Sequence, residues 1–92
     1  MDKSKSDLRQ TKAGAVWVSK MELAEYINYS TIADKFFERT PAWILQRLSG
    51  YVVNGKKAVF TESEYQTLAK AYRDIAGMLV QNADYIEKSA IE

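Results

Sequence analysis

The stretch that decides the fold is STIADKFFERTPAWILQRLSG, residues 30–50. It indicates two short helices joined by a polar corner, because its apolar residues fall into two helically spaced groups. Ser30 is a suitable N-cap for the first helix. The apolar residues of that helix share one stripe of about two turns: Ile32, Ala33, Phe36 and Phe37.

The second helix of this stretch has clear start and stop signals. Thr40 is a good N-cap, Pro41 suits the first helical position, and Gly50 suits the left-handed residue that ends a helix. We expect three residues to face inward: Ile44, Leu45 and Leu48. Three others should face outward: Ala42, Gln46 and Arg47. Two short helices around a tight corner form a helix-turn-helix pattern.

The outward face carries the residue types that read DNA bases. Arginine pairs with guanine and glutamine with adenine in the major groove, so we assign base contacts to Ala42, Gln46 and Arg47. The alternative is a solvated face on which Arg47 pairs with Glu38 or another nearby carboxylate. Trp43 could lie on the DNA side or in the core, and we favour the core.

The charge distribution along the chain supports this assignment. The formal net charge is only +1. Residues 1–34 hold five basic and five acidic side chains, residues 35–57 hold five basic side chains against Glu38 alone, and the remainder holds three against six. Positive charge is therefore concentrated on the helical pair and the segment after it. The expected phosphate contacts are Lys35, Arg39, Lys56 and Lys57.

The N-terminal third supports the helical pair. Residues 1–12 are too polar to order themselves, so we expect a flexible arm. Residues 13–82 then form the helix-turn-helix domain. Within it, residues 15–28 should form a helix that packs across the pair, with Trp17 in the core and Met21 on the same stripe.

Two interpretations remain for YVVNGKKAVF, residues 51–60. Asn54-Gly55 between β-branched residues is a strong signal for a hairpin, which would form a small wing. The segment could instead be an extended loop that turns at Asn54-Gly55. Because so short a hairpin is hardly stable alone, we favour the loop.

The C-terminal segment predicts one long helix. Thr61 and Glu64 form a capping box, and apolar residues then follow at alternating steps of three and four. The resulting seam is longer than the domain needs, so we expect a homodimer through Tyr72, Ile75, Leu79 and Ile86. Residues 83–92 would be a helical extension in that case. The alternative is that the helix ends near Asn82 and the tail frays.

Composition excludes several classes of site. The chain has no cysteine and no histidine, and no serine therefore has a histidine to activate it. We expect no enzyme activity, no cofactor and no metal. No apolar run approaches the roughly 20 residues that span a bilayer, so we also expect no membrane association and a cytoplasmic protein.

The segment TIADKFFERTPAWILQRLSGYVVNGKKAVFTESEYQTL resembles a family of small uncharacterised helical proteins from gut-bacterial genomes and mobile elements. The resemblance covers about residues 21–80. The same residues are similar to the helix-turn-helix of phage-repressor and excisionase-type proteins, in which a Gln-Arg pair faces DNA. This chain departs from them at the corner, where Phe37 replaces the usual glycine and the turn is one residue longer. The matching residues are Ala33, Thr40, Trp43, Ile44, Gln46, Arg47, Leu48, Gly50, Val53, Asn54, Gly55, Lys56, Ala58, Phe60 and Thr61.

Two hypotheses for the function follow. In both, the fold is all-α: a small helix-turn-helix domain with a long C-terminal helix and a short hairpin or loop at 51–60. The first hypothesis is a dimeric regulator that binds double-stranded DNA. The second is a non-enzymatic helical module that binds a partner protein through its C-terminal seam.

Overall fold

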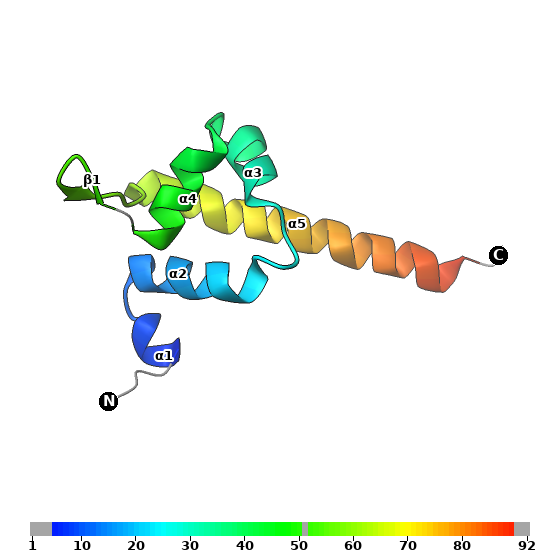
Figure 1. Cartoon of the computed structure of the whole chain (residues 1–92). Coiled ribbons are helices and arrows are strands. Elements are labelled where there is room, and N and C mark those ends of the chain that lie inside the picture. The colour runs from blue at the N-terminus through cyan, green and yellow to red at the C-terminus, as the bar shows by residue number, and fades with distance from the viewer. Residues whose placement is uncertain (1–4, 51, 90–92) are drawn as a thin grey trace.

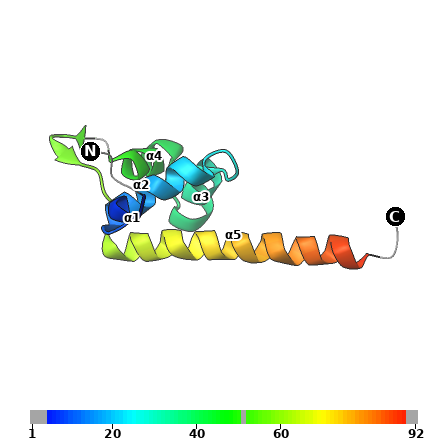
Figure 2. The same ribbon diagram turned by 90° about the horizontal axis from the view of Figure 1, so that it is seen from below.

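The computed structural model describes residues 5–50 and 52–89 and confirms the all-α fold. Helices α1 to α4 lie on one side of the long helix α5, whose C-terminal half projects beyond them (Figures 1 and 2). The elements, in chain order, are α1 (Lys5–Leu8), α2 (Lys12–Leu23), α3 (Tyr29–Ile32), the π-helix η1 (Ala33–Phe37), α4 (Pro41–Ser49), β1 (Val52–Val53), β2 (Lys56–Lys57) and α5 (Glu62–Lys88).

The first helix of the pair begins earlier than the sequence predicts. Asn28, not Ser30, is its N-cap, and the Asn28 side chain accepts a hydrogen bond from the Thr31 backbone N–H at 3.2 Å. The helix widens into a π turn at η1 and ends at Glu38, which has a left-handed φ of 55°. That conformation normally costs a non-glycine residue about 1–2 kcal/mol. The corner is therefore built without the glycine typical of repressor-type motifs.

The second helix of the pair, α4, forms as predicted at both ends. Thr40 accepts a hydrogen bond from the Trp43 backbone N–H at 3.3 Å, Pro41 follows it, and Gly50 ends the helix with φ 67°. Ile44 and Leu48 are fully buried. Leu45 was expected inside but is 41% exposed. The neighbouring elements cover only the side of α4 that carries Ile44 and Leu48, and Leu45 lies a quarter turn away.

The core collects residues from α2, α3, η1, α4 and α5. Its buried cluster consists of Val16, Tyr29, Ile32, Ala33, Ile44, Leu48, Phe60, Leu68 and Ala71. Helix α2 contributes a different face from the one predicted, because Trp17 is 40% exposed and Met21 is exposed too, whereas Val16 and Val18 are buried. The physical reason is that α2 packs against α4 and also borders α5. Two neighbours therefore bury its valines and leave Trp17 at the rim.

The segment after α4 forms a hairpin, so the loop that we favoured from the sequence is wrong. Strands β1 and β2 are antiparallel, with Val52 opposite Lys57. Asn54 and Gly55 both have positive φ, 53° and 78°. A turn with positive φ at both central residues matches the twist of a two-stranded hairpin, so Asn-Gly stabilises even this short one. We call residues 52–57 the wing.

Helix α5 begins with the predicted capping box and continues past Asn82 to Lys88. The Thr61 hydroxyl accepts from the Glu64 N–H at 3.3 Å, and Glu64 Oε1 accepts from the Thr61 N–H at 2.8 Å. Lys12 on α2 donates to Glu62 in the first turn, and this bond lowers the pKa of that carboxyl. In the described part of the chain no helix has the length and apolar character needed to cross a membrane.

The expected flexible arm contains one helical turn, α1, in its described part, and residues 1–4 lie outside the described residues. Arg9 follows that turn and forms an ion pair with Glu22 of α2 at 2.6 Å.

Candidate nucleic-acid interface

The exposed side of α4 carries the residues assigned to base contact. Ala42 is exposed, while Gln46 and Arg47 are half-buried. At 100° per residue, Gln46 lies on the side of α4 opposite Ile44 and Leu48, and Arg47 lies about 80° from the middle of the face that those two residues form. Neither Gln46 nor Arg47 belongs to the buried core cluster. This face of α4 therefore remains available to a ligand.

Arg47 lies along its own helix. Its guanidinium is 4.6 Å from the centre of the Trp43 ring, and Nη1 donates to the Trp43 carbonyl at 3.3 Å. Arg39, from the corner, lies 5.5 Å from the same ring. Trp43 thus holds two cations near it through cation–π attraction. The alternative pairing of Arg47 with Glu38 does not occur in the structure.

Trp43 is held in turn by an aromatic cluster. Its ring lies 5.0 Å from that of Phe37 and 5.7 Å from that of Phe60, and Phe60 lies 5.6 Å from Tyr65. Trp43 is half-buried and packs against the buried core cluster, so the core position that we favoured is confirmed in part. One portion of the ring packs on the core and another supports the arginines. The corner, α4 and α5 are tied together through this cluster.

The wing brings Lys57 back to the C-terminal end of α4. A Cβ atom built on Gly50 would lie 2.9 Å from Lys57 Cε, so the lysine stem crosses the residue that ends the helix. Glycine suits residue 50 because of its positive φ. Lys57 and Arg47 line one cavity of about 380 Å³ together with Trp17. Lys56 is exposed on the same strand.

Basic side chains therefore flank α4 at both ends. Lys35 and Arg39 are exposed near its N-terminal end, and Arg47, Lys56 and Lys57 lie near its C-terminal end. A helix of nine residues is about 14 Å long, close to the roughly 12 Å width of a DNA major groove.

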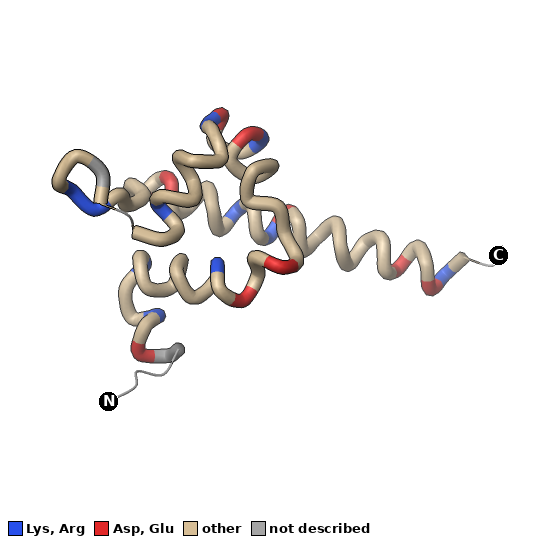
Figure 3. The backbone as a smooth tube through the Cα atoms, in the orientation of Figure 1, with Lys and Arg blue, Asp and Glu red and all other residues tan. Residues whose placement is uncertain are grey.

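These five cations have no acidic partner among residues 5–50 and 52–89. The ion pairs there join Arg9 to Glu22, Lys12 to Glu62 and Lys70 to Asp74, all on other elements. Figure 3 shows the basic residues of the wing without an acidic residue beside them. The wing end of the interface therefore has the unneutralised positive charge that a phosphate backbone attracts, whereas at the corner Lys35 and Arg39 follow the exposed acidic residues Asp34 and Glu38.

Two residues of this region were missed from the sequence. Lys20 donates to Ser49 Oγ at 3.0 Å at the end of α4, and Trp17 lines the cavity shared by Arg47 and Lys57. Trp17 was assigned to the core because tryptophan is mostly buried. The step of three residues from Trp17 to Lys20 on one helix face was the available signal.

The expected dimer seam divides into two parts. Ile75 packs against the core, and Tyr72 is hydrogen-bonded inside the domain, so these two residues serve the fold of one chain. Leu79 and Ile86 are exposed. The packed part of α5 ends near Ile75, because every residue from Ala76 to Ser89 is exposed.

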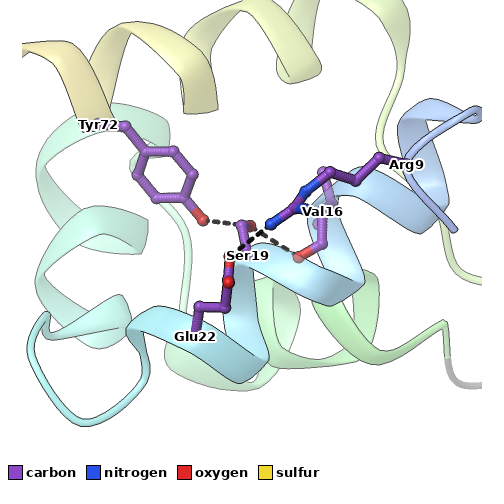
Figure 4. A network of polar contacts seen from close by, with 5 residues as sticks. All are labelled: Arg9, Val16, Ser19, Glu22 and Tyr72. Atoms are coloured by element: carbon purple, nitrogen blue, oxygen red, sulfur yellow. Dashed lines mark hydrogen bonds and ion pairs between the residues drawn. The ribbon is translucent and has the colours of Figure 1, made fainter. Parts of the chain in front are cut away.

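Tyr72 belongs to a chain of hydroxyl groups that joins α2, α3 and α5. Ser19 Oγ donates to the Val16 carbonyl and lies 2.8 Å from the Tyr72 hydroxyl (Figure 4). The Tyr72 hydroxyl lies 2.9 Å from that of Tyr29. Since each hydroxyl has one hydrogen, Tyr72 donates to Ser19 and Tyr29 donates to Tyr72. Burial, and then this bond, raise the pKa of Tyr29 far above its ordinary value.

Among the residues that the structure describes, no three acidic side chains gather in a way that could hold a metal ion. Residues 16–86 match the model of a protein family described as a domain of unknown function (DUF5053). No curated protein and no solved structure matches the chain.

Proposed function

The chain belongs to the DUF5053 family, a domain of unknown function, and we propose that it binds double-stranded DNA through α4 and the wing. The observation that carries the proposal is the set of five cations around α4 that lack acidic partners among the described residues. By contrast, Arg9, Lys12 and Lys70 each form an ion pair with a carboxylate of the described residues.

We assign phosphate contacts to the two ends of the interface and base contacts to the part between them. Lys35 and Arg39 at one end, and Lys56 and Lys57 at the other, would contact phosphates and set the register of α4 on the duplex. Ala42 and Gln46 lie between these ends and would face base edges. Arg47 would have to leave Trp43 to reach a base, so we assign it to phosphate or base contact near the wing.

The resemblance to repressor and excisionase proteins extends the proposal to a role. A small DNA-binding protein of this type would act as a transcription regulator, and its setting would be a mobile element of a gut bacterium. The longer corner, with Glu38 in the left-handed conformation, predicts a helix crossing angle different from that of the repressors.

The first test is the salt dependence of DNA binding. We expect the protein to bind a short labelled duplex of random sequence at low salt, measured by fluorescence anisotropy. With four or five phosphate contacts, affinity should fall roughly 100- to 500-fold when salt rises about fourfold. Binding that is absent at low salt, or that does not respond to salt, contradicts the proposal.

A charge-matched pair of variants then locates the interface. The triple variant Arg39→Gln, Lys56→Gln, Lys57→Gln should reduce the slope of log affinity against log salt by about 2.7. The control, Lys70→Gln, Arg73→Gln, Lys88→Gln, removes the same charge from α5 and should keep that slope. We leave Arg47 intact because its loss would also disturb Trp43. Equal effects of the two variants would mean that α4 and the wing are not the interface.

A further inference from the structure

The last part of α5 is a bare amphipathic helix. Every residue from Ala76 to Ser89 is exposed, and we call this segment the overhang. It is about 21 Å long at 1.5 Å per residue. Its large apolar side chains are between 55% and 77% exposed: Met78, Leu79, Val80, Tyr85 and Ile86. An isolated helix of this length is marginal in water, so a covering partner would stabilise it.

The apolar stripe of the overhang continues the stripe that binds the domain. Leu68 and Ile75 face the core, and Leu79 and Ile86 follow at steps of four and seven residues. At 100° per residue these four side chains stay on one line along the helix. The overhang therefore presents its apolar face on the side of α5 where the domain lies.

We propose that a second copy of this chain covers the overhang as an antiparallel helix pair, with the two-fold axis close to Asn82. The inference does not depend on DNA binding. Each overhang binds the same segment of the other molecule, so the two contact surfaces are identical.

A second copy suits the overhang better than a membrane or a nucleic acid. Asp84 and Glu87 outnumber Lys88 on its charged side, so an anionic surface would be repelled. Asn82 lies in the middle of the apolar stripe, and its amide bonds back to the Met78 carbonyl at 2.8 Å. An asparagine in such a seam can pair with its own copy across a two-fold axis and fix the register.

The position of the domain on α5 determines whether the two overhangs pair parallel or antiparallel. Figure 2 shows α1 to α4 on one side of α5, and the stripe of the overhang faces the same side. In a parallel pair in register, both domains would have to occupy the same space between the two helices. In an antiparallel pair they lie at opposite ends. Because a 21 Å helix face is small beside the roughly 800 Å² per partner of a stable interface, we expect a dissociation constant near micromolar rather than nanomolar.

Sedimentation velocity across a concentration series tests whether the dimer forms. The wild-type chain should shift from monomer to dimer, and Leu79→Glu with Ile86→Glu should remain monomeric, with a domain that is still folded by circular dichroism. The matched control, Gly77→Glu with Gln81→Glu, adds the same charge to the opposite face, where a side chain at residue 77 meets nothing within 4 Å. The control should still dimerise. A wild-type chain that stays monomeric up to millimolar concentration, or a control that dissociates equally, overturns the proposal.

Pulsed electron paramagnetic resonance tests the orientation. The chain has no cysteine, so single cysteines at Gln81 and at Lys70 take one spin label each. Both residues are exposed on the back of α5. In an antiparallel pair the two labels should be separated along the helix axis by under about 5 Å at Gln81 and by about 36 Å at Lys70. Equal distances at the two positions would mean a parallel pair and would contradict the inference.

Discussion

At the scale of single residues, the hydroxyl chain from Tyr29 through Tyr72 and Ser19 is the main polar feature inside the domain. It joins α3, α5 and α2 through partly buried hydrogen bonds beside a core that is otherwise apolar. Among the described residues, no buried side-chain nitrogen or oxygen lacks a hydrogen-bond partner. Such a chain fixes the relative rotation of three helices, because each hydroxyl has one donor hydrogen to place.

Tyr29 predicts how stability depends on alkaline pH. Its pKa is raised in the folded state, whereas an unfolded tyrosine ionises near pH 10. The stabilisation that comes from keeping the Tyr29 hydroxyl protonated in the fold is therefore complete below pH 10. It is lost as pH rises, and the free energy of unfolding falls by about 1 kcal/mol between pH 10 and 11. Tyr29→Phe should remove this part of the alkaline slope of unfolding free energy against pH. It should also lower the free energy of unfolding at neutral pH by about 1 kcal/mol.

Urea unfolding at several pH values measures both effects. Tyr26→Phe is the matched control, because Tyr26 is exposed and should change neither the slope nor the neutral-pH stability. If Tyr29→Phe kept the full alkaline slope of the wild type, the buried hydroxyl would not be its source.

At the scale of elements, α5 has two different roles along its length. Its first half is anchored by the capping box and packs on the core through Leu68 and Ala71, while every residue of its second half from Ala76 on is exposed. Helix α4 is the opposite case, because it is short and is fixed at both ends by Thr40 and Gly50. The candidate interface is built on this rigid short helix and not on the long one.

The capping box gives a prediction for α5. Thr61→Ala removes the hydroxyl that accepts from the Glu64 N–H and should cost about 1 kcal/mol of unfolding free energy. For a chain of this size, that corresponds to a melting temperature lower by roughly 4–8 °C.

Thr67→Ala is the control for the capping box. The Thr67 hydroxyl bonds only to the Ser63 carbonyl one turn earlier, so alanine there should be neutral or slightly stabilising. A thermal melt in which both variants lose the same stability would show that the box does not anchor α5.

At the scale of the whole molecule, the overhang dominates the shape. The radius of gyration is 15.9 Å and the extents are 57 × 36 × 22 Å. A compact chain of the same length would have a radius of gyration of about 12 Å. The excess comes from one straight helix, so the molecule consists of a packed domain and the projecting overhang.

This division predicts that the domain folds without the overhang. A chain that ends at Gly77 keeps every residue of the buried core and should remain folded, with a melting temperature that no longer depends on protein concentration. A chain that ends at Thr67 loses Leu68 and Ala71 and should not fold. Circular dichroism melts at several concentrations make the comparison. If the chain that ends at Gly77 did not fold, this division of the molecule would be contradicted.

The sequence by itself determined the elements whose signals are local. Thr40-Pro41, Gly50 and the box from Thr61 to Glu64 specify helix ends through a few neighbouring backbone groups, and these predictions were confirmed. The alternating apolar steps likewise determined that α5 is long, because periodicity needs no knowledge of the partner.

Only the tertiary structure decided which face each helix buries. Trp17 was expected inside and Leu45 was expected to pack, yet both are exposed because burial depends on neighbours that are distant in sequence. The same holds for Tyr72, which was assigned to a partner chain and instead bonds to Ser19 and Tyr29. Local spacing specifies a stripe on a helix, but the packing of helices from separate parts of the chain determines what covers that stripe.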